Sequence, residues 1–283
     1  MKSNPFGLKA VSTPTDHVND GCLEFVRTFC MVYKSVSLKS PQASSKEALA
    51  AIAKELKTME DLTVWDPYDT AMEVWDLRAI QKDALVVYAH LLLGCKNIEG
   101  TEDDSDPLLA FALKWKARLV AGGNRLLDNE GNHYREKGLY GAPTSLEAIR
   151  LVCWWATMSA DHVLLQADVS GAYLQSRLGG RPVWVVLPPA FWPDAWHKRG
   201  FRQPVLRLRK ALYGLQRSGF DWAMKAHKVL SGHGWKIIPN VVDAVYVLKE
   251  GTSICLMALY VDDILAAGPG DMLVKALNAI RGV

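Results

Sequence analysis

Apolar residues recur along the chain with two spacings, one typical of helices and one typical of strands. Apolar positions three or four residues apart predict helices over residues 45–59, 146–158 and 219–230. Shorter apolar runs bounded by turn residues predict strands. These runs occupy residues 84–93, 113–120, 163–168, 183–187 and 241–248. The mixture of helices and strands predicts an α+β fold.

The pattern also predicts how the chain divides into regions. Residues 1–60 are expected to be an N-terminal extension with one helix, and residues 61–283 the main domain. With 283 residues and 49% hydrophobic content, the chain can bury a sizeable core. It opens without the apolar segment of a signal peptide, and its apolar runs are too short or too interrupted to span a bilayer. We therefore expect no membrane partner and an intracellular location, in the cytoplasm or the nucleus.

A second pair of apolar runs, residues 253–259 and 264–267, flanks an acidic segment with the sequence Tyr-Val-Asp-Asp at 260–263. This pattern predicts a β-hairpin that carries Asp262 and Asp263 at its tip. Two carboxylates about 4 Å apart repel by roughly 4 kcal/mol at an effective dielectric constant near 20, and a divalent cation would reverse that cost. An ordinary polar turn explains the same residues, since Asp is a common turn former.

A third carboxylate favours the metal hypothesis. Asp168 ends the apolar run 163–168, and the residues after it, 169–174, are expected to open a helix. In the sequence, Asp168 and the hairpin acids thus share one feature, because each stands next to the end of an apolar strand. The hypothesis requires the three carboxylates to converge at one place in the fold.

The residues around these acids resemble the two catalytic blocks of the reverse transcriptase of copia-type retrotransposons. The blocks are residues 165–174 and 260–265, and their order and separation also match. Three further blocks agree with that family: residues 116–121, residues 183–191 with their Pro-Pro pair, and Leu-Tyr-Gly-Leu at 212–215 followed by Trp222. A weaker block joins Ala142 and Pro143 to Ile149 and Arg150. Several ordered motifs are far more specific than any single tetrapeptide.

The resemblance implies a fold and a chemistry. The fold would be the fingers and palm of a reverse transcriptase, with an antiparallel palm sheet, packed helices and the thumb missing. The activity would be RNA-directed DNA polymerisation, with Asp168, Asp262 and Asp263 as catalytic carboxylates. Two Mg²⁺ ions, for which Mn²⁺ could substitute, would be held by these acids and by the backbone carbonyl of Val169.

The resemblance also implies nucleotide-binding residues. Tyr173 would exclude a 2′-hydroxyl and so favour deoxynucleotides, although a core Tyr explains the residue equally simply. Lys116 and Arg118 would contact the incoming phosphates, and two exposed charges on a strand are the alternative. Arg217 is expected to bind nucleotide as well. It follows Gln216 where many family members carry Lys-Gln, so this contact is shifted or replaced.

Charge is distributed unevenly although the net charge is only +3. From residue 177 to 236, twelve Lys and Arg face two Asp, an excess of 12 − 2 = +10. Trp and Tyr residues are interleaved with them. Basic and aromatic residues together suit a surface that binds a nucleic-acid backbone. We expect most of these Trp side chains to lie in the core, so that the charge excess is the stronger indication.

The resemblance further implies partners, and rival hypotheses remain. The partners would be an RNA or DNA template, a DNA or tRNA primer and deoxynucleoside triphosphates. The chain would belong to a larger Pol polyprotein with integrase and ribonuclease H. One alternative is an inactive truncated remnant or a domesticated nucleic-acid-binding module without polymerase activity. A palm-fold cyclase would share the metal chemistry but leave the basic segment without a role.

Overall fold

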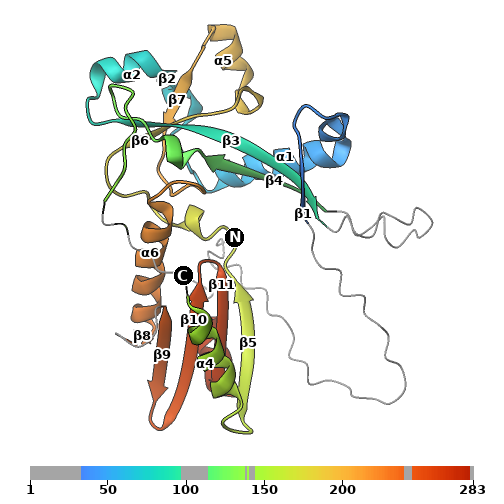
Figure 1. Cartoon of the computed structure of the whole chain (residues 1–283), viewed down its shortest axis with the longest axis vertical. Coiled ribbons are helices and arrows are strands. Elements are labelled where there is room, and N and C mark those ends of the chain that lie inside the picture. The colour runs from blue at the N-terminus through green and yellow to red at the C-terminus, as the bar shows by residue number, and fades with distance from the viewer. Residues whose placement is uncertain (1–32, 97–113, 138, 140–143, 239–243, 281–283) are drawn as a thin grey trace, which may run out of the picture. The chain divides into compact units, whose positions relative to one another are not determined.

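The computed structural model describes residues 33–96, 114–137, 139, 144–238 and 244–280 (Figure 1). The chain divides into two compact units, each built from segments that are distant in sequence. Unit 1 comprises the described residues within 137–177 and 217–283, and unit 2 those within 20–136 and 178–216. Each unit has its own sheet, and the mixed α+β class expected from the sequence is confirmed.

Unit 2 contains a six-stranded sheet in the order β1-β3-β6-β7-β2, with β4 paired to β3. The long antiparallel ladder between β3 and β4 corresponds to the two strands predicted over 84–93 and 113–120. A parallel pairing joins β3 to β6, the strand that the Pro-Pro pair terminates. The strands are β1 (Tyr33–Val36), β2 (Met72–Glu73), β3 (Leu85–Lys96), β4 (Lys114–Ala121), β6 (Val183–Val186) and β7 (Pro204–Arg207).

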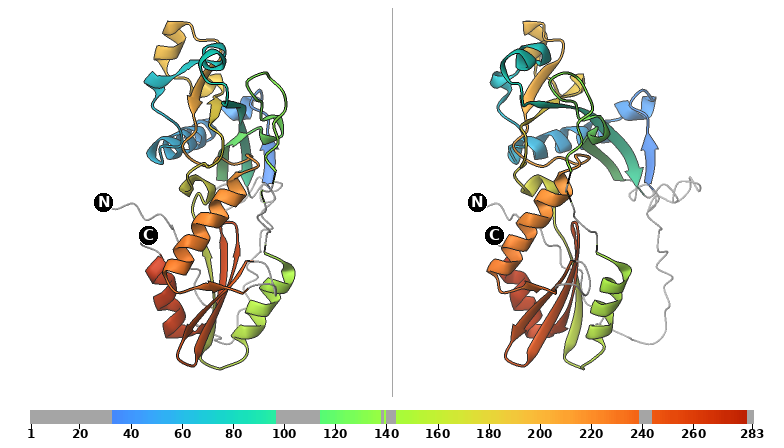
Figure 2. Two further views of the ribbon diagram at one scale, coloured as in Figure 1. Left: turned by 90° about the vertical axis from the view of Figure 1, so that its left-hand side faces the viewer. Right: turned by 60° about the vertical axis from the view of Figure 1, so that its left-hand side comes forward.

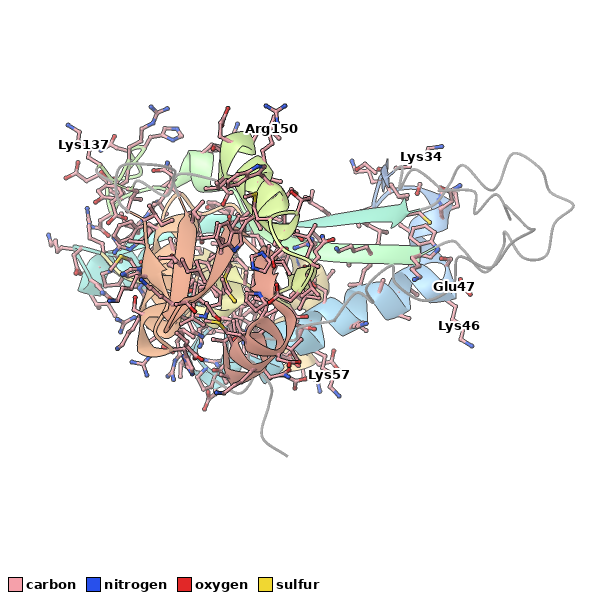
Figure 3. All side chains as sticks on the ribbon, turned by 90° about the horizontal axis from the view of Figure 1, so that it is seen from below. Lys34, Lys46, Glu47, Lys57, Lys137 and Arg150 are labelled. Carbon is pink, nitrogen blue, oxygen red and sulfur yellow. The ribbon has the colours of Figure 1, made fainter. Side chains whose placement is uncertain are left out.

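Helices and 3₁₀ turns complete unit 2, and its longest helix, α1, packs on β4. It begins after Ser45, whose hydroxyl accepts a hydrogen bond from the backbone N–H of Ala48 at 3.2 Å. Lys46 and Lys57 extend from α1 into solvent (Figure 3). The α-helices are α1 (Lys46–Asp61), α2 (Val74–Ile80) and α5 (Asp194–Arg199); the 3₁₀ turns are Pro41–Ser44, Tyr68–Thr70, Gly123–Arg125 and Pro189–Phe191.

Unit 1 contains a five-stranded, wholly antiparallel sheet in the order β5-β11-β10-β9-β8. Its central hairpin, β10 and β11, is the one predicted from the two apolar runs around the acidic turn. The strands are β5 (His162–Asp168), β8 (Lys236–Ile237), β9 (Val245–Glu250), β10 (Ser253–Tyr260) and β11 (Asp263–Pro269). Chain-distant β5 and β11 are therefore neighbours, and this pairing positions the candidate site.

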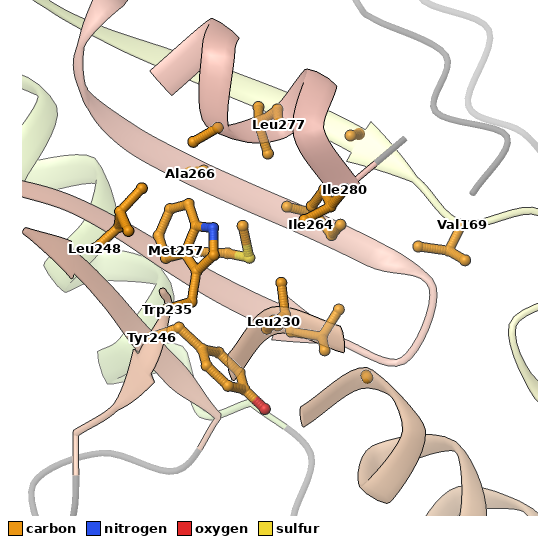
Figure 4. Packing of buried hydrophobic residues seen from close by; sticks show 14 of the residues in the cluster. Val169, Leu230, Trp235, Tyr246, Leu248, Met257, Ile264, Ala266, Leu277 and Ile280 are labelled. Atoms are coloured by element: carbon orange, nitrogen blue, oxygen red, sulfur yellow. The ribbon is translucent and has the colours of Figure 1, made fainter. Parts of the chain in front are cut away.

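Helices cover both faces of this sheet: α4 (Leu146–Ala156) lies on one side, and α6 (Ser218–Gly232) and α7 (Gly270–Ile280) on the other (Figure 2). Beneath α4, Val152 packs against Leu256, Ala258 and Ala267. A larger core fills the other face, where Figure 4 shows Trp235, Leu248, Met257 and Leu277 among its members. Two buried layers give the sheet a rigid base from which the hairpin turn projects.

Some expectations were wrong in detail. The helix expected to open after Asp168 is only a 3₁₀ turn over Tyr173–Gln175, because Gly171 adopts a positive φ of 63° that interrupts helical geometry. The strand predicted from residue 241 begins at Val245, and residues 241–243 lie outside the described part. The expected domain boundary at residue 60 stays a prediction. Among the helices that the structure describes, none has both the length and the apolar character needed to cross a bilayer.

Candidate active site

The pairing of β5 with β11 brings two of the predicted acids together. Asp168 and Asp263 are directly opposite each other in the antiparallel ladder. Opposed Cα atoms in such a ladder are about 4.5–5.5 Å apart. Asp262 precedes Asp263 in the two-residue turn that closes the hairpin, because Tyr260 pairs with Asp263. The three carboxylates predicted from the sequence therefore meet at one end of the unit 1 sheet.

The hairpin turn has an unusual backbone that other segments hold in place. Val261 has a φ of 53°, at a turn position that usually carries Gly. Its carbonyl accepts a hydrogen bond from the indole N–H of Trp222 at 2.7 Å. The next carbonyl, that of Asp262, accepts one from the backbone N–H of Val169 at 2.7 Å. Both turn carbonyls are thus fixed, one by α6 and one by the residue that follows β5.

The electrostatics of the site are those of crowded carboxylates. Partial desolvation raises the pKa of Asp263, and the negative charges of Asp262 and Asp168 raise it further. Asp168 and Asp263 are exposed, and Asp262 is half-buried. Within the described part of the chain, none of the three forms an ion pair with a Lys, Arg or His side chain. The site is therefore a solvent-accessible concentration of negative charge formed by hard oxygen donors.

The side chains are not arranged as a finished metal cage. In the described ranges, no group of three or more His, Cys, Asp or Glu side chains has the geometry to hold a metal ion. Mg²⁺ is commonly held by only one or two carboxylates, with water and substrate phosphates as the other ligands. The chemistry of the donors fits Mg²⁺ on this basis, and Val169, predicted as a carbonyl ligand, lies beside the acids through its bond to Asp262.

Tyr173 lies close to the acidic turn. Its ring is half-buried against the larger core of unit 1. Burial raises the pKa of its hydroxyl, and the negative charges of Asp262 and of the ionised Tyr260 hydroxyl raise it further. Tyr173 thus packs in the core and also lies near Asp262. Its interpretation as a core residue therefore does not exclude its interpretation as the residue that rejects a 2′-hydroxyl.

Lys116 and Arg118 belong to unit 2, on the same face of β4 because they are two positions apart. The Arg118 guanidinium lies 4.8 Å from the centre of the Tyr213 ring, a cation–π contact. Glu55 of α1 accepts a hydrogen bond from the backbone N–H of Leu119 at 3.0 Å. Burial raises the pKa of Glu55, although that bond and the two cations oppose the increase. Both basic side chains are half-buried rather than fully solvated.

Arg217 lies at the start of α6 in unit 1 and is engaged by its own helix. Its Nε donates to both carboxylate oxygens of Asp221, at 3.0 and 3.2 Å, and its guanidinium lies 5.4 Å from the Phe220 ring centre. Gln216 donates from its side-chain amide to the carbonyl of Gly123 at 3.1 Å in unit 2. A nucleotide contact by Arg217 would therefore have to coexist with, or replace, the pair with Asp221.

The basic segment 177–236 is divided between the two units. Most of its Trp side chains are buried, as expected, with exposed fractions between 1% and 8% for Trp184, Trp196, Trp222 and Trp235. The aromatic residues of this segment thus mainly build cores. The prediction of nucleic-acid binding by this segment therefore rests on its charge excess.

Two residues that support the turn were not predicted as part of the site. Trp222 belongs to one of the motif blocks, but no sequence signal shows which carbonyl its N–H reaches. Thr144 is 6% exposed, and its hydroxyl donates to the carbonyl of Leu259, just before the acidic turn. Ala142 and Pro143 of the weak block lie outside the described residues, whereas Arg150 extends from α4 into solvent (Figure 3).

Comparison with known proteins agrees with the motifs. Residues 103–280 match the family model described as reverse transcriptase (RNA-dependent DNA polymerase). The chain is 32% identical over 189 residues to the retrovirus-related Pol polyprotein from transposon RE2 of Arabidopsis thaliana. It is 33% identical over 178 residues to that from transposon RE1 of the same plant, and 25% identical over 210 residues to that from transposon TNT 1-94 of Nicotiana tabacum.

These alignments cover most of this chain but a small part of each relative. They span 65%, 62% and 72% of the chain, and 12%, 11% and 15% of the RE2, RE1 and TNT 1-94 polyproteins. The chain therefore corresponds to one region of much longer proteins. The family resemblance inferred from the motif blocks is confirmed.

Proposed function

Since the chain belongs to the reverse transcriptase (RNA-dependent DNA polymerase) family, we propose that it is the polymerase core of a retrotransposon Pol polyprotein. In this proposal unit 1 is the palm and unit 2 the fingers. The observation that carries it is the register of β5 and β11, which sets Asp168 opposite Asp263 and next to Asp262. The reaction would join a deoxynucleotide to a primer 3′-hydroxyl along an RNA or DNA template.

The three acids would act as oxygen ligands on one side of the reacting groups. Asp168, Asp262 and Asp263 would hold the metal through their carboxylate oxygens, and the carbonyl of Val169 would add a neutral ligand. Two Mg²⁺ ions, when bound, would activate the primer hydroxyl and stabilise charge on the phosphate and the leaving group. The repulsion that raises the pKa of Asp263 supports cation binding, because a cation would relieve it.

The remaining residues would bind and select the nucleotide. Tyr173, held by the core beside Asp262, would exclude a ribonucleotide by contact with its 2′-hydroxyl. Lys116 and Arg118 of β4 would bind the triphosphate, and Arg118 is the better suited to a two-point contact. Arg217 would contribute if it exchanged Asp221 for a phosphate. The basic excess over 177–236 would neutralise template and primer phosphates.

The wider context is proposed from the relatives. Their names describe Pol polyproteins of transposons, so we propose that this chain works within such a polyprotein, beside integrase and ribonuclease H. A tRNA or DNA strand would serve as primer. The cytoplasm, in virus-like particles, or the nucleus would be the place of action.

Metal binding and primer extension test the proposal. Mn²⁺ binding to the full chain, followed by electron paramagnetic resonance, should be lost or weakened at least tenfold in Asp262→Asn. Asp161→Asn is the matched control, because Asp161 is an exposed acid at the far end of β5. Extension of a primed RNA template should be measured with the full chain, and with a fusion to the region that follows the matched segment in a relative.

The outcomes separate the hypotheses. Templated extension that Asp262→Asn abolishes and Asp161→Asn preserves is the expected result. Extension that survives Asp262→Asn would remove the metal role. Salt-sensitive template binding without extension in either protein would favour a nucleic-acid-binding module or an inactive remnant.

A further inference from the structure

The acidic turn holds a backbone conformation that its own sequence does not favour. Val261 has a positive φ of 53°, where a β-branched residue is strained and Gly is usual. Such conformations persist when surrounding contacts impose them. The turn also carries Asp262 and leads directly into Asp263, so its conformation decides where both carboxylates are placed.

One face of α6 supplies such contacts. Trp222 donates its indole N–H to the carbonyl of Val261 at 2.7 Å, and Lys225 donates from Nζ to the carbonyl of Gln175 at 2.9 Å. Residues three apart lie on the same side of a helix. The helix thus contacts both the turn with Asp262 and the segment that begins at Asp168 and contains Tyr173.

Trp222 is suited to hold this position because it is buried in the core. Its side chain is only 3% exposed and packs in the larger core of unit 1. Because rotamer freedom is restricted in a close-packed core, the direction of the N–H is restricted as well. The adjoining carbonyl, that of Asp262, is held by the Val169 N–H, so movement at Val261 would also disturb the link between the turn and β5.

We propose that Trp222 is a positioning residue that fixes the acidic turn, so that Asp262 and Asp263 face Asp168 in the arrangement that binds metal. The proposal rests on the function proposed above. Trp222 acts through the Val261 carbonyl and not through contact with metal or nucleotide. Its indole N–H, rather than the bulk of its ring, is the group responsible.

The chain contains a matched control in Trp235. It belongs to the same core and is 1% exposed (Figure 4). Unlike that of Trp222, its indole N–H has no hydrogen-bond partner among the described residues. Trp→Phe at either position removes a similar amount of buried aromatic surface. Only the substitution at position 222 also removes a hydrogen-bond donor to the acidic turn.

Two measurements on the full-length variants Trp222→Phe and Trp235→Phe test the proposal. Hydrogen exchange by NMR reports whether the Val169 amide still bonds to the turn. We expect exchange at least tenfold faster in Trp222→Phe than in Trp235→Phe. Mn²⁺ affinity should fall by about tenfold in Trp222→Phe, which corresponds to about 1.4 kcal/mol, and stay within twofold of wild type in Trp235→Phe. A residue that only stabilises the fold would affect both variants alike.

Equal exchange rates in the two variants would overturn the proposal, and so would faster exchange with unchanged Mn²⁺ affinity. A wild-type chain that binds no Mn²⁺ would refute the metal function, while the exchange rates would still decide whether Trp222 holds the turn. If Trp222→Phe does not fold, benzothienylalanine introduced at position 222 removes the N–H with sulfur in its place and leaves the ring size nearly unchanged.

Discussion

Replacing Gly214 by Ala should destabilise unit 2 far more than the addition of one methyl group suggests. Gly214 has a φ of 89°, and a Cβ there would lie 2.1 Å from the carbonyl oxygen of Ala121 at the end of β4. The neighbouring Tyr213 carbonyl accepts the Ala121 N–H at 2.7 Å, so the two segments are in backbone contact. Because the clash is with backbone atoms and not with the end of a flexible side chain, one of the two segments would have to move.

The cost can be divided into separate contributions. The positive φ costs an L-residue about 1–2 kcal/mol. Overpacking typically adds about 1–3 kcal/mol, and loss of the Ala121 hydrogen bond about 1 kcal/mol. Gly200→Ala is the matched control in unit 2, because Gly200 has a similar φ of 72° but no atom within 4 Å of an added Cβ. We therefore expect about 3–6 kcal/mol for Gly214→Ala and about 1–2 kcal/mol for Gly200→Ala.

Urea unfolding followed by Trp fluorescence measures both variants against the wild type, with the two units fitted as separate transitions if they are resolved. The expected difference between the variants is about 2–4 kcal/mol in the free energy of unfolding of unit 2. Equal losses, within about 0.5 kcal/mol, would show that the contact between Gly214 and β4 does not constrain the fold. The Leu-Tyr-Gly-Leu block would then need another explanation.

Further predictions concern charge, a buried acid and a helix cap. Asp263→Asn should stabilise the metal-free chain by about 1 kcal/mol after allowance for solvent screening. Because the pKa of Asp263 is raised in the folded state, the stability of the wild type falls as pH rises from the ordinary Asp value of 3.8 through the raised pKa. In urea titrations the advantage of the variant should therefore appear across that pH window and persist above it, and an advantage independent of pH would contradict the charge argument. Glu73→Ala should lower the free energy of unfolding by about 2–4 kcal/mol. This carboxylate is 8% exposed and accepts hydrogen bonds from two backbone N–H groups of the loop before β7, at 2.7 and 2.8 Å. Asp76→Ala, at an exposed position, should be nearly neutral in the same assay. Ser145→Ala should cost unit 1 about 1 kcal/mol by removing the cap on the Ala148 N–H at the start of α4, and loss of less than a few tenths would mean that water replaces the cap.

The predicted elements were those whose apolar pattern is strong within a short stretch. The runs that became β6, β10 and β11 are apolar because their strands are buried in sheets, whereas β5 is an edge strand that is only partly buried. Helices α1 and α4 show both a Ser cap and helical spacing. Shorter elements such as β2 were missed, because two residues carry too little periodicity. The 3₁₀ turn after Asp168 was expected to be a helix because the positive φ of Gly171 is a backbone fact that spacing does not show.

Sequence by itself singled out the three candidate acids, the position of the hairpin and the family to which the chain belongs, because these depend on local pattern and on ordered motifs. Only the tertiary structure decided that β5 lies beside β11 in the register that opposes Asp168 and Asp263, since partner and register of strands far apart in sequence are set by whole-core packing. It also decided that the indole N–H of Trp222 reaches the Val261 carbonyl while the indole N–H of Trp235 has no hydrogen-bond partner among the described residues. Two Trp residues in one core look alike in a sequence, and only the positions of their neighbours distinguish them.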